Sequence, residues 1–215
     1  MVRVMSLGGS LISPNPGEVD IEFLKKLKNL VKTIDEKFII VCGGGKLSRY
    51  YQSAAKKFKV KNKDLDYIGI AATRLNAELV KSIFNTSIIG LKKEKIGKVS
   101  ISCGFEPGHS TDYNAVILAK IYGAKEVINL TNIDYVYDKD PKLPDAKPIE
   151  KIKMDDYLKI VRDKWIPGKN VPFDPIATKI AKKYKIKIVI LNGKKIENLK
   201  NFIKGKKFIG TIIEP

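Results

Sequence analysis

Three consecutive glycines, Gly43-Gly44-Gly45, stand directly after the apolar run Phe38–Cys42. The run predicts a short buried strand, and residues 46–58 carry apolar side chains at the spacing of one helix face. Glycine lets a backbone approach an anion closely, and a helix start presents unpaired N–H groups and a positive dipole end. The segment therefore predicts either a phosphate-binding loop or a tight turn, and other parts of the chain must distinguish the two.

Strand-like and helix-like segments alternate along most of the 215 residues. This alternation predicts an α/β fold, a three-layer α/β/α sandwich with a mainly parallel central sheet covered by helices on both faces. We expect a single domain, 1–215, with a division into two lobes, 1–122 and 123–215. The predicted strands are 2–7, 38–42, 86–89, 98–103, 126–130, 186–191 and 208–213. The predicted helices are 21–34, 46–58, 64–83, 111–122, 155–161, 175–184 and 198–203, with Asp20 and Asp174 as N-caps of two of them.

The net charge of +18 is large and comes almost entirely from lysine. Such a charge suits nucleic acid or an acidic substrate. The lysines are scattered along the whole chain, which is more typical of a solvated surface, so nucleic acid is a disfavoured partner. No apolar run approaches the roughly 18 residues of a membrane helix, and the start of the chain does not resemble a signal peptide. We expect a soluble cytoplasmic protein whose two cysteines, Cys42 and Cys103, are small core residues.

Four loops follow predicted strands at their carboxyl ends: 8–10, 43–46, 104–112 and 131–140. Ligands of open α/β sheets bind at that edge. Two glycine-rich loops on one edge indicate more than one phosphate, as for a phosphoryl donor and a phosphorylated acceptor, whose mutual repulsion backbone N–H groups, cations and a metal ion would offset.

Other phosphate-site and metal-site patterns are absent from the sequence. It lacks the three spaced glycines of a dinucleotide site, and Lys46 is not followed by the Ser or Thr of a P-loop. His109 is the only histidine and there is no Cys/His cluster. We therefore assign no protein metal ligands and expect any metal to be Mg²⁺, held mainly by phosphates and water.

Eight short motifs along the chain resemble those of a known family. In order along the chain they are G-G-S at 8–10, G-G-G-K-L-S-R at 43–49, D-Y-I-G-I at 66–70, T-R-L-N-A at 73–77, P-G-H-S-T-D at 107–112, T-N-I-D at 131–134, Y-D-K-D-P at 137–141 and D-P-I-A-T-K-I at 174–180. Together they resemble the amino acid kinase superfamily, and most of all its archaeal-type UMP kinases, over nearly the whole chain.

The resemblance implies Mg²⁺-dependent transfer of the ATP γ-phosphate to UMP, giving UDP, in a homohexamer. It implies an acceptor side in the first lobe and an ATP side in the second. The residues implied for ATP are Gly9, Ser10, Gly45, Arg49, Thr131, Asn132, Tyr137 and Asp140. Those implied for UMP are Gly44, Asp66, Pro107, Gly108, His109, Ser110, Thr111 and Asp112. The implied catalytic residues are Arg49, Asp174 and Lys179.

The residues themselves support some of these roles and leave alternatives open for others. Arg49 lies one turn into the helix that starts at the glycines, so its guanidinium can reach the same anion through two hydrogen bonds. Thr111 begins a predicted helix, where a hydroxyl suits a phosphate or serves as an ordinary cap. Asp174 is either catalytic or only a helix cap, Lys179 is either functional or solvated, and His109 either contacts substrate or packs within its loop.

The chain departs from the superfamily pattern at three places. Ser6 stands where the superfamily usually has lysine, which leaves the main catalytic cation open among Lys46, Arg49 and Lys179. Tyr135 replaces a common glycine, and the stretch 85–102 is short, so that a helix of the family is expected to be missing.

Three alternatives remain. A kinase acting on another small phosphate, such as isopentenyl phosphate, shares the fold but usually carries a histidine in its glycine loop. A non-catalytic nucleotide-binding regulator would be expected to have lost Arg49, Asp112 or Asp174, and all three are present. A basic nucleic-acid-binding protein would gather its lysines on one face.

Overall fold

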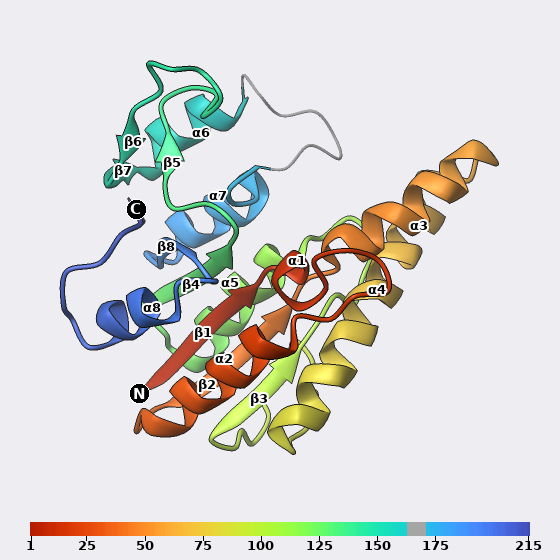
Figure 1. Ribbon diagram of the computed structural model, residues 1–215, viewed down its shortest axis with the longest axis horizontal. Helices are drawn as coiled ribbons and strands as arrows, with labels where there is room; N and C mark the ends of the chain where they lie inside the picture. Colours follow the sequence, from red (N-terminus) through yellow and green to blue (C-terminus); the bar gives the residue numbers. More distant parts are fainter. Residues whose placement is uncertain (163–170) are drawn as a thin grey trace.

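A seven-stranded sheet runs through the middle of the computed structural model, which describes residues 1–162 and 171–215 (Figure 1). The strand order is β3-β2-β1-β4-β8-β9-β7, and all neighbours are parallel except β8 and β9. The strands are β1 (Val2–Leu7), β2 (Lys37–Cys42), β3 (Val99–Ser102), β4 (Glu126–Thr131), β7 (Lys151–Lys153), β8 (Lys187–Asn192) and β9 (Thr211–Glu214). A separate antiparallel pair joins β5 (Val136–Tyr137) to β6 (Pro148–Ile149).

Helices cover both faces of the sheet, and the predicted three-layer arrangement is confirmed. One face packs against α2 (Ile21–Thr33), α4 (Asn62–Phe84) and α8 (Ile196–Ile203). The other packs against α5 (Thr111–Tyr122), α6 (Met154–Arg162) and α7 (Pro175–Lys183). Successive strand residues point to opposite faces. Met5 and Leu7 of β1 therefore enter one core cluster, whereas Val4 enters the other.

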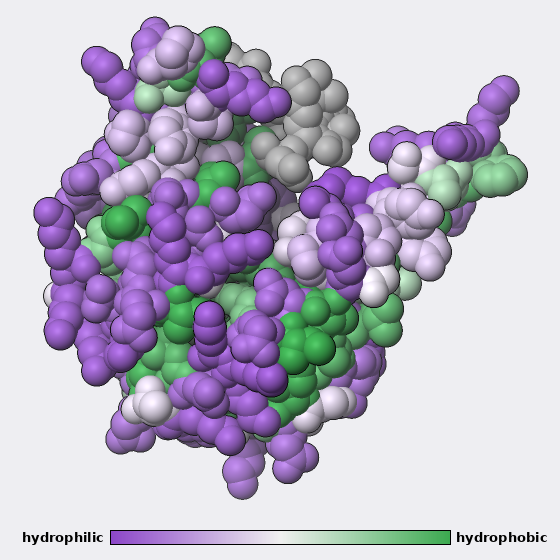
Figure 2. Space-filling model, in the orientation of Figure 1, coloured by the Kyte–Doolittle hydropathy of each residue, from purple (hydrophilic) through white to green (hydrophobic). Residues whose placement is uncertain are grey.

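One helix stands apart from these layers. The helix α3 (Gly45–Lys57) begins at the glycines, as predicted, and projects from the body beside α4 (Figures 1 and 2). None of its residues, all of which the structure describes, is buried. Tyr50, Tyr51 and the neighbouring Phe58 are 62%, 58% and 82% exposed. Its apolar periodicity thus marks a face that the single chain leaves in solvent.

Both predicted N-caps are present. The side chain of Asp20 accepts a hydrogen bond from the Phe23 backbone N–H at 3.0 Å, and Asp174 caps α7 with Pro175 at the first helical position. Cys42 and Cys103 are free and buried, as expected. None of the helices in the described ranges is long and apolar enough to cross a membrane.

Some local predictions are wrong. The segment 86–89 forms a single bridge, between Ile88 and Ile101, in place of a strand. The last strand begins at Thr211 and not at Phe208, because Gly210 lies against the Ile190 carbonyl and Asn198 binds the Ile209 backbone on both sides. The four-residue helix α1 (Gly9–Ile12) and strand β7 were not predicted. As expected from its length, the described segment between α4 and β3 contains no helix. The segment 164–172, which contains the only tryptophan and which the sequence predicts to be a loop, lies mostly outside the described residues.

The loops that follow β1 and β2 touch each other through their backbones. A Cβ atom on Gly9 would overlap the Gly43 carbonyl oxygen and the Gly45 amide nitrogen. Gly45 also has a φ angle of +59°, which side chains other than glycine rarely adopt. Since parallel pairing fixes Leu7 opposite Cys42, the two loops cannot separate without shifting the strands that carry them.

We therefore expect Gly9→Ala to destabilise the protein. Forcing a methyl group into packed backbone costs about 1–3 kcal/mol of unfolding free energy, to be measured by urea denaturation. The matched control is Gly90→Ala, where the nearest atom to a new Cβ is the Glu94 Oε1 at 3.5 Å. Equal stability of the two variants would contradict the packing described for the loops.

Candidate active site

A cavity of about 240 Å³ opens at the carboxyl ends of β1, β2 and β4. Of the predicted site residues, those that line it are Gly9, Ser10, Gly44, Gly45, Arg49, Thr111, Asp112, Thr131 and Asn132. It is also lined by Ser6, Gly8, Leu11, Gly43, Asn129, Leu130, Val171 and Pro172. Residues from both halves of the chain thus meet around one small polar space.

The floor of the cavity is built from fixed backbone. The Asn76 side chain is buried and donates a hydrogen bond to the Gly43 carbonyl at 2.8 Å. The Gly8 N–H donates to the Leu130 carbonyl at 2.9 Å and so ties the first glycine loop to β4. A Cβ on Gly43 would lie 3.6 Å from the Thr111 hydroxyl. The glycines therefore face the start of α5 across the cavity.

The two cationic side chains that follow the glycines, Arg49 and Lys46, point in different directions. The Arg49 guanidinium donates to the Ser10 hydroxyl at 3.4 Å and lines the cavity. Partial burial lowers the pKa of Arg49, although an arginine stays charged at any physiological pH. The Lys46 ammonium donates instead to the Asn15 side chain at 3.1 Å, and Lys46 is not among the described residues that line the cavity.

The start of α5 is capped by Ser110, whose hydroxyl accepts a hydrogen bond from the Tyr113 N–H at 3.2 Å. Thr111 and Asp112 therefore form the first helical turn, as predicted, and the ordinary capping role proposed as an alternative for Thr111 belongs to Ser110. Thr111 lines the cavity, together with a helix start that favours an anion.

Asp112 is half-buried in this turn and accepts two hydrogen bonds. The Ser6 hydroxyl donates to its Oδ1 at 2.7 Å, and the Asp174 backbone N–H donates to its Oδ2 at 3.2 Å. Burial raises the pKa of Asp112 to about 6, although the Ser6 hydrogen bond acts in the opposite direction. Ser6, at the position where the superfamily usually has lysine, thus holds a carboxylate and does not present a cation.

Asp174 binds two helix starts at once. Its Oδ1 accepts from the Ile176 and Ala177 N–H groups at 2.6 and 3.3 Å, which caps α7, and its Oδ2 accepts from the Ser110 hydroxyl. Next to it, the Tyr157 hydroxyl donates to the Phe173 carbonyl at 2.7 Å and accepts from the Phe173 N–H at 2.8 Å. Burial raises the pKa of Tyr157, so this anchor stays a neutral phenol.

A second cavity, of about 420 Å³, adjoins the first and shares with it Thr131, Asn132, Val171 and Pro172. Its other polar and aromatic lining includes the predicted Tyr137 and Asp140, and also Tyr135. The rest of the lining is Ile133, Val136, Lys139, Pro141, Ile160 and Val161. A mostly apolar pocket with a few polar groups suits a planar base and its sugar.

The remaining predicted residues lie outside both linings. The Asp66 carboxylate accepts a hydrogen bond from the Gly108 N–H at 2.9 Å, which joins α4 to the loop that contains Pro107. His109 stacks on Tyr113, with ring centroids 4.2 Å apart. Lys179 is exposed on α7 and is not among the described residues that line either cavity.

Sequence reasoning missed the asparagines that hold this site together. Asn129 lines the first cavity and donates to the Pro172 carbonyl at 2.7 Å, and Asn114 donates to the Cys103 carbonyl at 2.8 Å. Both side chains are buried, as is that of Asn76. A buried polar side chain needs a partner, so an isolated asparagine in an apolar pattern was the signal that could have found them.

The raised pKa of the Asp112 carboxyl predicts a pH-dependent stability. Its folded pKa, about 6, lies above its ordinary value of 3.8, so the folded state binds the proton more tightly. The contribution of Asp112 to stability is thus largest below pH 4 and falls as the pH rises to about 6, by about 3 kcal/mol in total. In Asp112→Asn this decline disappears, so the variant gains about that much relative to wild type between pH 4 and 7. The test is urea denaturation across this range; a pH-independent difference would contradict the assignment.

The comparisons with known proteins agree with this geometry. The model of the amino acid kinase family matches residues 1–95 and 91–192. The chain is 36% identical to a protein named uridylate kinase from Thermococcus kodakarensis, over 99% of both chains. It is also 36% identical to a uridylate kinase from Archaeoglobus fulgidus, over 99% of this chain and all of the relative.

Solved structures give the same result. The crystal structure of uridylate kinase from Archaeoglobus fulgidus superposes with a TM-score of 0.78 at 34% identity, over 99% of this chain and all of the other. UMP kinase from Ureaplasma parvum, at 20% identity, has the same fold, with a TM-score of 0.82 over 100% of this chain and 99% of the other. The chain belongs to the amino acid kinase family, and within it to the archaeal-type uridylate kinases.

Proposed function

We propose that this protein is a UMP kinase that transfers the γ-phosphate of ATP to UMP, giving UDP and ADP. The observation that carries the proposal is the pair of glycine loops in backbone contact at one sheet edge, facing the start of α5 across a cavity. Such a space can hold two phosphate groups side by side, and the relatives named uridylate kinase match along their full lengths.

The ATP phosphates would lie against Gly9, Ser10, Gly45 and Arg49, where the glycine N–H groups and one guanidinium converge. The base and ribose of ATP would occupy the larger adjoining cavity, which Thr131, Asn132, Tyr137 and Asp140 line. Because Thr131 and Asn132 line both cavities, a nucleotide in the larger one would lead its phosphates into the smaller one. The segment 123–215 would thus supply most of the ATP side.

UMP would bind on the side built by residues 1–122. Its phosphate would lie between Gly44 and the first turn of α5, with Thr111 as hydrogen-bond donor. The loop from Pro107 through Gly108, His109 and Ser110 to Asp112 would surround it. Asp66, which already binds the Gly108 N–H, would fix this loop and hold the ribose of UMP.

In the reaction, a UMP phosphate oxygen forms a bond to the γ-phosphorus while the bond from that phosphorus to the bridging oxygen breaks. ADP leaves with the electron pair of the broken bond. No general base is needed, because the acceptor is already an anion at neutral pH. Positioning and charge neutralisation therefore supply most of the acceleration. We propose that Arg49 binds the transferring phosphoryl group and that Asp174 positions the first turns of α5 and α7. Lys179 would supply a further positive charge from α7.

The donor set fits a Mg²⁺ ion bound mainly through phosphates and water. Within the described residues, no group of three or more His, Cys, Asp or Glu side chains is placed to hold a metal. The carboxylates at the starts of α5 and α7, Asp112 and Asp174, already accept hydrogen bonds from protein donors. When bound to the phosphates, Mg²⁺ would neutralise part of their charge.

We further propose that the protein is cytoplasmic and assembles into a homohexamer, as the resemblance implies. The exposed aromatic side chains of α3 support an assembly of this kind, because exposed apolar groups on a projecting helix are typical of a contact between subunits.

The proposed activity is tested by measuring ADP formation with ATP, Mg²⁺ and a panel of UMP, CMP, AMP and isopentenyl phosphate. We expect UMP to be the preferred acceptor. Preference for isopentenyl phosphate would assign the chain to another small-phosphate kinase, and absence of turnover with all four would indicate a nucleotide-binding regulator.

We expect Arg49→Ala to lower kcat at least about a hundredfold, the scale on which one charge-stabilising donor acts in a transition state. Lys46→Ala is the matched control, because this lysine begins the same helix but points to Asn15, and we expect it to lower kcat by less than about fivefold. Steady-state kinetics with UMP checks both variants. The reverse ranking would move the catalytic role from Arg49 to Lys46.

A further inference from the structure

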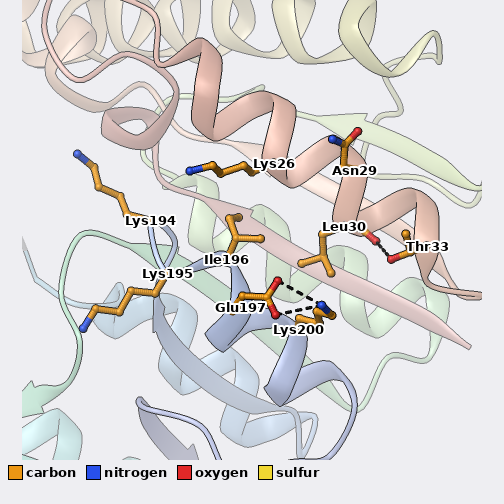
Figure 3. Close-up of a pocket in the computed structure, with 9 residues that line it drawn as sticks. All are labelled: Lys26, Asn29, Leu30, Thr33, Lys194, Lys195, Ile196, Glu197 and Lys200. Atoms are coloured by element: carbon orange, nitrogen blue, oxygen red, sulfur yellow. Dashed lines mark hydrogen bonds and ion pairs between the residues drawn. The ribbon is translucent and has the colours of Figure 1, made fainter.

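A third cavity, of about 610 Å³, lies between α2 and α8 (Figure 3). Over the described residues it shares no lining with the two cavities of the candidate active site. Its lining consists of Lys26, Asn29, Leu30, Thr33, Lys194, Lys195, Ile196, Glu197 and Lys200. We call this cavity the lysine groove, because four of the nine side chains are lysines and only one is acidic.

The lysine groove has unneutralised positive charge. Lys200 pairs with Glu197 at 3.0 Å, and Lys195 pairs with Asp134 at 2.8 Å, outside the groove. Lys26 and Lys194 have no ion-pair partner within the described part of the chain. In Figure 3 these two side chains project toward the same end of the groove, whereas Lys195 turns away. Two like charges, Lys26 on α2 and Lys194 before α8, thus border the groove without an ion-pair partner in the described protein.

The start of α8 adds hydrogen-bond donors to the groove. Its N-cap position is held by Lys195, whose side chain makes no capping hydrogen bond, since an ammonium group has no lone pair to accept one. The first helical N–H groups, at Ile196 and Glu197, therefore lack the side-chain acceptor that usually satisfies them. Both residues line the groove.

Farther along, the groove has an apolar floor and a polar rim. Leu30 is buried and lies beside Ile196, and Asn29 and Thr33 follow on the same side of α2 (Figure 3). The unpaired cations and the free N–H groups come from both walls of the groove, Lys26 from α2, and Lys194 with the first N–H groups from the start of α8. A chain of linked phosphates offers negative charge to both walls at once.

We propose that the lysine groove binds an oligophosphate chain, either a free inorganic one or the tail of a nucleoside triphosphate. Several linked phosphates would place negative charge against Lys26 and Lys194 and accept hydrogen bonds from the first turn of α8. The gain comes from offsetting two cations that lack an ion-pair partner and the positive end of a helix dipole. A nucleoside attached to the chain would lie over Leu30 and Ile196.

The test is a calorimetric titration of tripolyphosphate into protein whose active site is filled with UMP and a non-hydrolysable ATP analogue. We expect wild type to bind one equivalent and the double variant Lys26→Glu, Lys194→Glu to bind at least about tenfold more weakly, or about 1.4 kcal/mol. The control is Lys32→Glu, Lys207→Glu, which changes the net charge equally at exposed lysines outside the groove; its affinity should stay within about twofold of wild type.

Two further measurements complete the experiment. Kinase activity with UMP shows that both double variants are folded. A parallel titration with CTP separates the sources of the ligand: equal affinity for CTP and tripolyphosphate indicates recognition of the phosphate chain alone, and tighter CTP binding indicates that the nucleoside is also bound.

The proposal is overturned if wild type does not bind tripolyphosphate with the active site filled, or if both double variants weaken binding equally, since diffuse surface charge would explain that result. It is also overturned if a single-stranded RNA, and not tripolyphosphate, binds in a way that depends on Lys26 and Lys194.

Discussion

The structure depends on a backbone contact between two loops, in which Gly9 and Gly45 lie so close that neither can carry a side chain. Parallel pairing of β1 and β2 would by itself leave their carboxyl ends about 4.8 Å apart, with room for side chains between the following loops. Because both positions are glycine, the backbones of the two loops form one continuous surface. The position of Arg49 follows from this contact, because its helix begins at Gly45.

A second constraint, the partial burial of two carboxylates, fixes the opposite wall of the site. Asp112 joins Ser6 on β1 to the backbone of Asp174, and Asp174 joins the first turns of α5 and α7. A buried carboxylate is costly unless donors surround it, so each of these segments is held where its donor is needed. The site is thus assembled from segments far apart in the sequence, and hydrogen bonds to two aspartates keep those segments in register.

The sequence was sufficient for whatever depends on local pattern. Glycines after apolar runs located the loops, the alternation of elements gave the layers, and Asp20 and Asp174 marked helix starts. Features set by tertiary contacts could not be predicted, because they depend on residues far apart in the sequence. The role of Ser6 depends on a residue more than a hundred positions away, and the segment 86–89 has strand-like residues but pairs with β3 at only one of them. The lysine groove exists only because α2 and α8 pack side by side.

The start of α3 and its exposed outer turns differ in how well they tolerate substitution. The part from Gly45 to Arg49 contributes both of these residues to the lining of the cavity, so substitutions there act on the site. Beyond it, no described α3 residue is buried, and a surface position away from special contacts usually tolerates replacement within about 0.5 kcal/mol. The outer turns can therefore vary between relatives at little cost to the fold, and what limits their variation is contact with other molecules.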